Sequence, residues 1–259
     1  MEAKAKTTTT TKRKAVGSEG QQNWQNHIAL VTGANRGIGY EICRSLARQG
    51  CNVILTSRDP DKGLQAVEKL SRDHTITGRI VFHELDITRQ QSIDDIYRWI
   101  IKCYGHLDIL VNNAAIYLDE GMSVFDIDEN VMHQTMEVNF YGAFRMCRRF
   151  VPLMIQNGFG RIVNVSSGYG AMSEMAGYTA AYRISKASLN ALTLIMADEL
   201  RNTSIKVNAV CPGWVSTNMG GSMAPTSPRS AAEDIAHFGM INESGPTGGF
   251  FRFRKKIGW

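Results

Sequence analysis

Short apolar runs alternate with longer helical patterns along most of the chain. The runs are rich in Val, Ile and Leu and lie at residues 27–33, 52–57, 79–86, 107–114, 160–167, 205–213 and 248–253. Between them, apolar residues recur with helical spacing at residues 38–49, 60–72, 90–103, 129–156, 180–200 and 228–239. Nearly continuous apolar strands separated by helices are typical of a parallel sheet covered on both faces. The pattern therefore predicts a single doubly wound α/β domain at residues 27–259, with a seven-stranded parallel sheet and helices on both faces.

The first 26 residues differ from this pattern. Residues 1–26 are polar, rich in Thr, Lys and Gln, and lack hydrophobic periodicity, so we expect a disordered tail. Part of the net charge of +5 lies in this tail, and a fold that binds an anionic cofactor accounts for a basic charge more simply than nucleic-acid binding does. We therefore expect no nucleic-acid partner. Because the tail has no apolar core like that of a secretory signal, we predict a cytoplasmic protein. Its Ser/Thr and basic content leaves a plastid or mitochondrial transit peptide as the alternative.

Two further classes of protein are disfavoured by composition. No apolar run approaches the roughly 18 residues that span a bilayer, so we expect no membrane segment. The five cysteines are scattered and show no C-x-x-C spacing. Neither a disulfide framework nor a metal site is therefore expected.

A glycine-rich turn follows the first predicted strand and opens the first predicted helix. Gly33, Gly37 and Gly39 lie there, in the segment VTGANRGIGYEI. Glycine permits a tight turn and lets a ligand's phosphates approach the backbone, while the helix N-terminus adds free N–H groups and a positive dipole end. In this context the turn predicts a dinucleotide site in a Rossmann-type domain. The alternative is a turn needed only for packing.

Two arginines indicate which dinucleotide would bind. Arg36 lies inside the glycine turn, and Arg58 follows the second strand. An acidic residue at the end of that strand favours a free ribose 2′-hydroxyl, whereas an arginine suits a 2′-phosphate because its guanidinium can pair bidentately with phosphate. We therefore expect NADP(H) as the cofactor. The alternative is that Arg58 pairs with Asp59 or Asp61 at the surface.

A tyrosine and a lysine lie one helical turn apart in the segment AAYRISKASL. These residues, Tyr182 and Lys186, share one face of the predicted helix. A nearby ammonium lowers the pKa of a phenol, which would make Tyr182 a proton donor near neutral pH. In isolation such a pair is more often a packed tyrosine and a snorkelling lysine, so its meaning depends on the rest of the chain.

Taken together, the motifs resemble the short-chain dehydrogenase/reductase superfamily. The shared features are T-G-x-x-x-G-x-G at residues 32–39, N-N-A at residues 112–114, Asn139 in EVNFYG, a serine after the fifth strand, and Y-x-x-x-K. The resemblance covers residues 27–259. Within the superfamily, TGANRGIG, CPGWVSTNM and GPTGGFF are similar to NADPH-dependent carbonyl reductases and their plant relatives that act on terpenoid and alkaloid ketones.

The resemblance implies a catalytic role for four residues. Tyr182 would protonate the carbonyl oxygen as hydride arrives, and Lys186 would lower the pKa of that tyrosine and hold the nicotinamide ribose. Ser167 would hydrogen-bond the substrate carbonyl, and Asn139 would hold a water that links Lys186 to solvent. Ser166 is the alternative to Ser167, because only one of two adjacent strand residues can face the cleft.

The resemblance also implies the binding residues. Those expected at the cofactor are Gly33, Asn35, Arg36, Gly37, Ile38, Gly39, Arg58, Asp86, Ile87, Asn113, Tyr182, Lys186, Val215 and Thr217. Asp86 would accept from the adenine amine, or would instead cap the next helix together with Thr88. Ser167, Tyr182 and Trp214 would contact the substrate. An apolar pocket wall is expected from Trp214, Met219, Met223, Tyr169, Met172, Met175 and Tyr178.

We therefore expect an enzyme that uses NADPH to reduce the carbonyl of a small apolar ketone or aldehyde. One alternative is NADP+-dependent oxidation of a steroid or terpenoid alcohol. Another is a non-catalytic nucleotide-sensing protein, which would have no need of a proton donor. Monomeric carbonyl reductases carry a much longer insertion between the positions of Ser167 and Tyr182. The helices at residues 129–156 and 180–200 are therefore free to pair, and we expect a homodimer or homotetramer.

Overall fold

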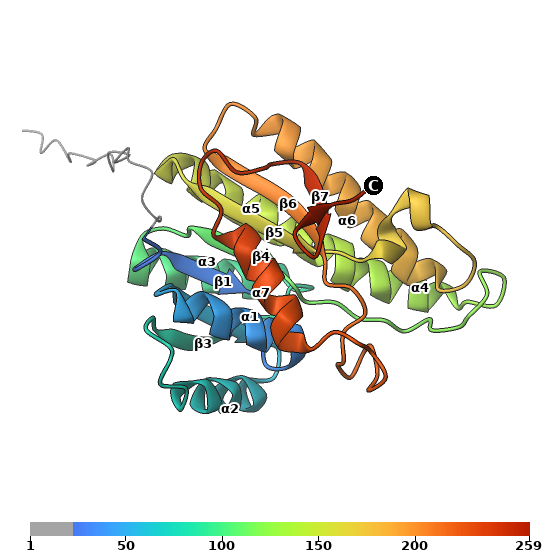
Figure 1. Ribbon diagram of the computed structural model, residues 1–259, viewed down its shortest axis with the longest axis horizontal. Helices are drawn as coiled ribbons and strands as arrows, with labels where there is room; N and C mark the ends of the chain where they lie inside the picture. Colours follow the sequence, from blue (N-terminus) through green and yellow to red (C-terminus); the bar gives the residue numbers. More distant parts are fainter. Residues whose placement is uncertain (1–22) are drawn as a thin grey trace, which may run out of the picture.

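The computed structural model describes residues 23–259 and contains one eight-stranded sheet with the strand order β3-β2-β1-β4-β5-β6-β7-β8 (Figure 1). The strands are β1 (Ile28–Val31), β2 (Asn52–Ser57), β3 (Ile80–Glu84), β4 (Ile109–Asn112), β5 (Gly160–Val165), β6 (Ile205–Cys211), β7 (Gly249–Arg252) and β8 (Lys255–Lys256). Strands β1 to β7 pair in parallel, and β8 pairs antiparallel with β7. The order reverses between β1 and β4, which is where doubly wound sheets bind ligands.

The helices agree with the predicted segments except in one place. They are α1 (Gly37–Arg48), α2 (Pro60–Ser71), α3 (Gln90–Tyr104), α4 (Glu129–Met136), α5 (Ala143–Asn157), α6 (Ala180–Glu199) and α7 (Pro228–Gly239), with short 3-10 turns at Gly168–Gly170 and Met172–Glu174. The predicted continuous helix at residues 129–156 is wrong, because a π-helical segment, Glu137–Gly142, separates α4 from α5. Within residues 23–259, no helix combines the length and apolarity needed to cross a membrane.

Helices cover both faces of the sheet because successive strand residues point to opposite sides. In β1, Ala29 and Val31 pack into a core formed with α1, α2 and α7, whereas Ile28 and Leu30 pack into a second core with α3, α5 and α6. Figure 1 shows these two helical layers on either side of the strands. Burial of one such aliphatic side chain stabilises the fold by roughly 1.5–3 kcal/mol. The predicted doubly wound α/β architecture is confirmed.

Strand β8 is one element that the hydrophobic pattern did not predict. It is joined to β7 by a two-residue turn in which Phe253 and Arg254 have φ of 51° and 60°. Such turns usually hold Asn or Gly, because other residues adopt a positive φ with strain. The two exposed lysines of β8 also lack the apolar character of a strand. The predicted count of seven strands is therefore too low by this short edge strand.

The ordered domain begins earlier than predicted. Trp24 is buried, and its ring lies 4.8 Å from that of His27 and 6.3 Å from that of Phe159, measured between centroids. The end of the predicted tail at residue 26 is therefore wrong, because a tail residue belongs to the core. The rest of the predicted tail, residues 1–22, lies outside the described residues.

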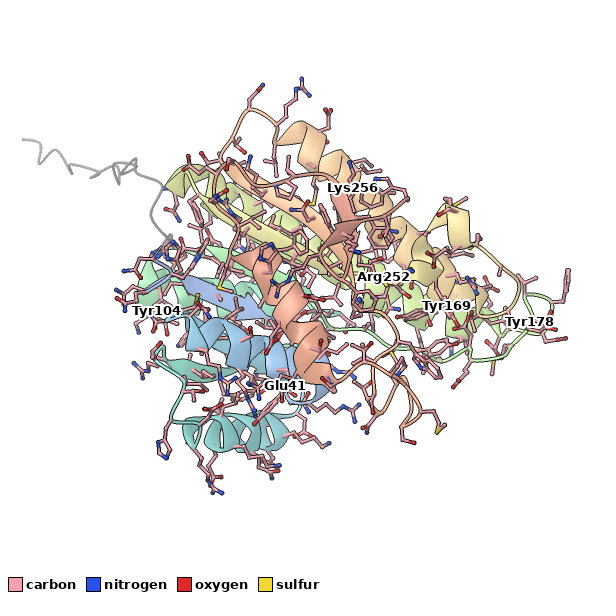
Figure 2. The ribbon with its side chains drawn as sticks, viewed as in Figure 1. Glu41, Tyr104, Tyr169, Tyr178, Arg252 and Lys256 are labelled. Carbon is pink, nitrogen blue, oxygen red and sulfur yellow. The ribbon has the colours of Figure 1, made fainter. Side chains whose placement is uncertain are left out.

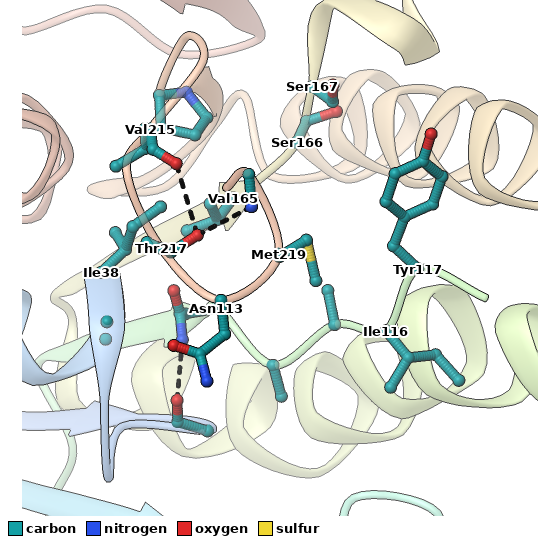
Figure 3. Close-up of a pocket in the computed structure, with 18 of the residues that line it drawn as sticks. Ile38, Asn113, Ile116, Tyr117, Val165, Ser166, Ser167, Val215, Thr217 and Met219 are labelled. Atoms are coloured by element: carbon teal, nitrogen blue, oxygen red, sulfur yellow. Dashed lines mark hydrogen bonds between the residues drawn. The ribbon is translucent and has the colours of Figure 1, made fainter. Parts of the chain in front are cut away.

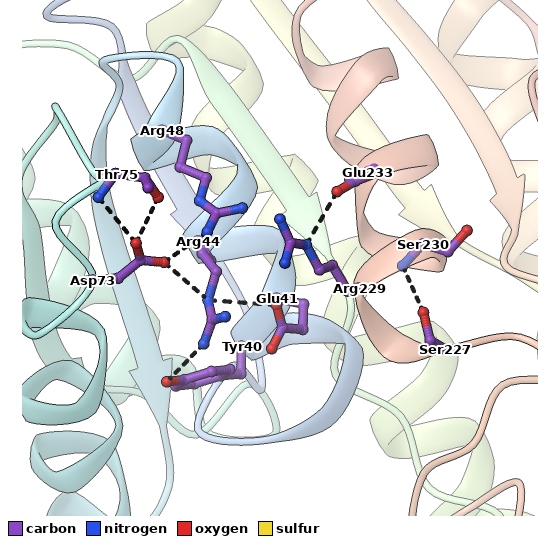
Figure 4. A network of polar contacts seen from close by, with 10 residues as sticks. All are labelled: Tyr40, Glu41, Arg44, Arg48, Asp73, Thr75, Ser227, Arg229, Ser230 and Glu233. Atoms are coloured by element: carbon purple, nitrogen blue, oxygen red, sulfur yellow. Dashed lines mark hydrogen bonds and ion pairs between the residues drawn. The ribbon is translucent and has the colours of Figure 1, made fainter.

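A polar network joins α1 to the turn after α2 (Figure 4). Asp73 accepts hydrogen bonds from the backbone and hydroxyl of Thr75 and pairs with Arg48 at 2.9 Å and with Arg44 at 3.6 Å. The Thr75 hydrogen bonds, and then Arg48, hold the pKa of Asp73 down to about 2. On α7 nearby, Arg229 pairs with Glu233 at 3.4 Å. These arginines all have carboxylate partners, so the network holds elements together and offers no free cation for a ligand.

Candidate active site

A pocket of about 1120 Å³ lies at the carboxyl ends of the parallel strands (Figure 3). Every residue predicted to act in catalysis, bind the cofactor or contact the substrate, except Asn139, lines it, although these residues are scattered along the chain. They are Gly33, Asn35, Arg36, Gly37, Ile38, Gly39, Arg58, Asp86, Ile87, Asn113, Ser167, Tyr182, Lys186, Trp214, Val215 and Thr217. The fold thus gathers the turns after β1 to β6 into one cavity, as parallel strands with a common direction require.

The glycine turn after β1 forms one end of the pocket. Gly33 and Gly37 have φ of 63° and 60°, a region that other residues rarely adopt. The side-chain nitrogen of Asn113, Nδ2, fixes the turn by donating to the backbone carbonyls of Thr32 at 2.9 Å and Gly33 at 3.1 Å. Arg36, at the N-cap of α1, makes no side-chain cap bond, and the first turn of α1 holds no acidic residue. The N–H groups and positive end of α1 therefore suit the pyrophosphate of a dinucleotide.

Arg36 and Arg58 are exposed at the same end of the pocket. Arg58 forms no ion pair with a carboxylate in the described part of the chain. Asp59, one of its two predicted alternative partners, instead pairs with Lys62 at 2.6 Å and accepts the backbone N–H of Lys62 as the N-cap of α2. The alternative of a surface pair for Arg58 is therefore wrong. Both guanidinium groups are available to an anionic ligand such as a ribose phosphate.

Two roles were predicted for Asp86, contact with an adenine or capping of the next helix. It lines the pocket, yet its Oδ1 accepts from the backbone of Thr88 at 3.0 Å and from the hydroxyl of Thr88 at 2.7 Å. The following helix α3 has Arg89 at its N-cap, so Asp86 and Thr88 form a turn and do not cap the helix. Contact between Asp86 and an adenine stays a prediction.

Helix α6 brings Tyr182 and Lys186 to the centre of the pocket. Lys186 is 2% exposed, and its Nζ donates to the carbonyl of Val165 at 2.8 Å. The same Nζ lies 5.7 Å from the centroid of the Tyr182 ring. Loss of hydration lowers the pKa of Lys186 to about 8. Burial raises the pKa of Tyr182 above its ordinary range, although a hydrogen bond with Ser167 opposes the rise.

The expected lowering of the Tyr182 pKa by Lys186 is therefore not found. Removal from water disfavours the charged form of each group, which raises the pKa of a phenol and lowers that of an ammonium. The ammonium of Lys186 is also directed at a backbone carbonyl and not at the phenol oxygen. Tyr182 consequently keeps its proton at neutral pH and is a weaker acid than a phenol in water.

The two adjacent serines after β5 have different surroundings. Ser166 is 2% exposed, and its hydroxyl donates to the side-chain oxygen of Asn190 at 2.6 Å in the interior. Ser167 lines the pocket, is partly exposed, and hydrogen-bonds with Tyr182. The geometry thus favours Ser167 over Ser166 as the residue that would contact a substrate carbonyl.

Asn139 lies behind the pocket, within the π-helical segment. Its side chain is 1% exposed and accepts from the backbone N–H of Ile116 at 2.8 Å. Its amide nitrogen donates to the carbonyl of Ile116 at 2.9 Å and to the hydroxyl of Ser185 at 3.0 Å. Asn139 therefore links α6 to the chain after β4. π-Helical turns occur often at functional sites, and the expected water-holding role of Asn139 stays a prediction.

Aromatic residues surround Tyr182 on the substrate side. The ring centroids of Tyr117 and Tyr169 lie 4.7 Å and 6.3 Å from that of Tyr182. Of the predicted apolar wall, Tyr169, Met219 and Trp214 line the pocket. The wall members that lie outside this lining, and for which the prediction is wrong, are Met172, Met175, Tyr178 and Met223. Tyr178, for example, lies at the outer edge of the molecule (Figure 2).

Among the lining residues that sequence reasoning missed are Tyr117, Glu174 and Arg252. The guanidinium of Arg252 donates to both carboxylate oxygens of Glu174, at 2.9 Å and 2.8 Å, so their charges compensate each other. Tyr117 follows β4 and Arg252 ends β7, so both lie at the carboxyl ends of the parallel strands, as the predicted residues do. Their positions directly after or at the end of a strand could therefore have predicted that they line the pocket. Glu174 follows no strand, and only its ion pair with Arg252 places it there.

Comparison with known proteins identifies the family. A family model described as short chain dehydrogenase matches residues 27–227. The chain belongs to the short-chain dehydrogenase/reductase family. It is 33% identical to (+)-neomenthol dehydrogenase of Arabidopsis thaliana, over 88% of this chain and 96% of the relative. It is 35% identical to carbonyl reductase [NADPH] 1 of Sus scrofa, over 90% and 94% respectively. A metagenomic short-chain oxidoreductase solved in complex with NADP has a TM-score of 0.76 and 28% identity, over 89% and 98% of the two chains.

In this short-chain dehydrogenase/reductase, Lys186→Met is expected to change how stability depends on pH. The folded protein holds the lysine at a pKa of about 8, against an ordinary 10.5. Between these pH values the unfolded chain binds more protons, so the wild type gains stability as pH rises. The gain is on the order of 3 kcal/mol, and the variant lacks it. Urea unfolding of the two proteins at several pH values from 7 to about 10.5 measures this difference. A difference that does not vary with pH would contradict the prediction.

Proposed function

We propose that this protein uses NADPH to reduce the carbonyl of a small apolar ketone or aldehyde to an alcohol. The observation that carries the proposal is one continuous pocket, with the glycine turn at one end and Ser167, Tyr182 and Lys186 grouped further along it. A dinucleotide and a small ketone would lie side by side in such a space. The relatives named carbonyl reductase and neomenthol dehydrogenase, and the NADP complex of a third, support this assignment.

The chemistry divides between the cofactor and the side chains. NADPH supplies the hydride to the carbonyl carbon, and the protein orients the reactants and provides the proton. Negative charge develops on the carbonyl oxygen, so donors aimed at that oxygen lower the barrier. In the proposal, the Ser167 hydroxyl holds this oxygen, and Tyr182, a phenol and thus the stronger acid, gives up its proton. Lys186, which also lines the pocket, would hold the nicotinamide ribose.

The proposed direction, reduction, uses Tyr182 in its protonated form. Burial raises the pKa of this phenol, so the protonated form dominates at neutral pH. Reduction requires a protonated tyrosine, whereas oxidation of an alcohol requires the phenolate as a base. The protonated phenol is thus the form that reduction needs, and the relative named carbonyl reductase [NADPH] 1 supports this direction over the alternative of an oxidative alcohol dehydrogenase.

The substrate end of the pocket favours an uncharged, apolar molecule. Aromatic rings of Tyr117, Tyr169 and Trp214 border it. Arg252 is neutralised by Glu174, so it cannot serve as a free cation for a carboxylate substrate. Sites of this kind bind apolar ligands through aromatic surface and orient them with a few polar groups, which here would be Ser167 and Tyr182.

The proposed setting of this reaction is a cytoplasmic homodimer or homotetramer. Apolar side chains are exposed on α5 and α6, among them Phe144 and Ile155 on α5 and Leu194 and Ile195 on α6. Pairing of these helices between subunits would remove that apolar surface from water, and light scattering would measure the assembly.

The alternative of a plastid or mitochondrial transit peptide depends on residues 1–22, which lie outside the described residues.

A screen of ketones and aldehydes with NADPH and with NADH tests the proposed function. We expect loss of the reduced-nicotinamide absorbance that depends on a carbonyl compound, with kcat/KM at least about tenfold higher for NADPH. The preference has its basis in the guanidinium groups of Arg36 and Arg58, which form no ion pair with a carboxylate of residues 23–259, and Arg58→Ala should reduce it. Tight NADPH binding without turnover on any compound would favour the nucleotide-sensing alternative. A clear preference for NADH would contradict the cofactor assignment.

A further inference from the structure

Helix α6 begins without a local cap. Its N-cap residue, Thr179, has a φ of 56° and makes no side-chain cap hydrogen bond. The preceding residue, Tyr178, has a φ of 63°. Two successive non-glycine residues in the left-handed region are strained and persist only where the surroundings hold them. The start of the helix that carries Tyr182 and Lys186 must therefore be fixed by another part of the chain.

Asp119 supplies that cap from the segment after β4. Its Oδ2 accepts from the backbone N–H of Ala181 at 2.7 Å and from that of Tyr182 at 3.3 Å, from 62 and 63 positions earlier in the chain. A carboxylate at this place satisfies N–H groups that the helix itself leaves unbonded, and it lies at the positive end of the helix dipole. One of its two contacts is with the backbone of the proposed proton donor.

The burial of Asp119 is unusual for a residue that only caps a helix. The side chain is 0% exposed, and its Oδ1 has no hydrogen-bond partner in the part of the chain that the structure describes. A buried carboxylate is unfavourable unless its bonds compensate for lost hydration, and here only one oxygen is compensated. Asp128, by contrast, caps α4 from an exposed position.

Two neighbours of Asp119 contact the same stretch of α6. The ring of Tyr117 lies 4.7 Å from that of Tyr182, between centroids, and the carbonyl of Met122 accepts from the backbone N–H of Thr179 at 3.0 Å. Residues 117–122 thus hold the start of α6 at three points. Among the three, the carboxylate of Asp119 makes the direct polar contact with the Tyr182 backbone.

We propose that Asp119 is a positioning residue that fixes Tyr182 for proton transfer. The inference rests on the proposed function, in which Tyr182 is the proton donor. Lys186 is held separately, by the carbonyl of Val165. Loss of the Asp119 contact would therefore move Tyr182 relative to Ser167 and Lys186 while the cofactor end of the pocket keeps its shape. A misplacement of about 1 Å at a reacting group can slow a reaction by about 100-fold.

Three substitutions separate position from charge. Asp119→Ala removes the acceptor, and we expect kcat to fall by about 10- to 100-fold with NADPH affinity within about twofold of wild type. Asp119→Asn keeps an oxygen in the same place without the charge, so its kcat should stay within about threefold of wild type. Asp119→Glu keeps the charge but displaces the carboxylate by one methylene, and its kcat should fall below that of the Asn variant.

The measurements are kcat, KM, NADPH affinity by fluorescence titration and the solvent deuterium isotope effect on kcat, which should increase in the Ala and Glu variants. Asp128→Ala, the loss of an exposed helix cap, serves as the control and should leave all four unchanged. Higher activity of Asp119→Glu than of Asp119→Asn would overturn the inference, even if the Ala variant does not fold. Equal losses of kcat and NADPH affinity in the Asp119 variants would also overturn the inference. Tyr182→Phe, measured alongside, tests the proposed function separately, because full activity of that variant would refute the proton-donor role itself.

Discussion

Tyr182→Phe is expected to bind NADPH as tightly as the wild type and to reduce carbonyl substrates about 1000-fold more slowly. The substitution deletes only the phenol oxygen, whose proton the reaction consumes, and general acids contribute roughly 100- to 10,000-fold to rate. The ring itself remains to pack against Tyr117 and Tyr169. NADPH fluorescence titration and steady-state turnover measure the two effects separately.

A matched control for this variant is Tyr104→Phe. Tyr104 ends α3 and lies far from the pocket (Figure 2), so the same loss of a hydroxyl should leave kcat within about twofold. Retention of most activity by Tyr182→Phe would show that another group delivers the proton. A loss of NADPH affinity equal to the loss of rate would instead indicate a damaged pocket.

Gly39→Ala is expected to weaken NADPH binding by about 100-fold or more. A Cβ at this position would lie 2.5 Å from the Asn113 amide nitrogen, 2.8 Å from the carbonyl oxygen of Gly33 and 2.9 Å from the Cα of Ala34. Asn113 cannot yield easily, because it holds the carbonyls of Thr32 and Gly33. The methyl group must therefore displace the turn from the N-terminus of α1, where phosphate would bind.

Gly105→Ala provides the comparison for the glycine turn. Gly105 has a φ of 75°, but a Cβ there would meet nothing within 4 Å. The variant should lose stability through backbone strain of about 1 kcal/mol yet bind NADPH as the wild type does. Thermal unfolding and fluorescence titration of both variants distinguish strain from disruption of the site. Unchanged NADPH affinity in Gly39→Ala would show that the turn does not shape the cofactor site.

The local patterns in the sequence were sufficient for most of the fold. Strands β1, β2, β4, β5 and β6 are largely buried because helices cover both faces, and that burial appears directly in the sequence as short runs rich in Val, Ile and Leu. The π-helical segment around Asn139 could not be predicted, because its apolar spacing differs little from that of an α-helix. β8 could not be predicted either, because Phe253 and Arg254 occupy the two positions of the hairpin turn, where Asn or Gly would have indicated a turn.

Prediction of the site succeeded where residues are fixed by short motifs and failed where they are fixed by distant contacts. The glycine turn, Tyr182 and Lys186 line the pocket, and their motifs carried that information. The capping of α6 by Asp119 joins segments 62 positions apart, and no periodicity marks it. The direction of the Tyr182 pKa was also wrong from the sequence, because the degree of burial depends on the whole fold.

The two lysines of β8 have a consequence for the protein in concentrated solution. β8 is the outermost strand on its side of the sheet, and both of its residues, Lys255 and Lys256, are exposed. An open edge with unbonded N–H and C=O groups is where a second molecule can add its own strand and begin a fibril. A molecule that approached in this way would bring its own pair of ammonium groups against these two, and the repulsion discourages edge-to-edge polymerisation.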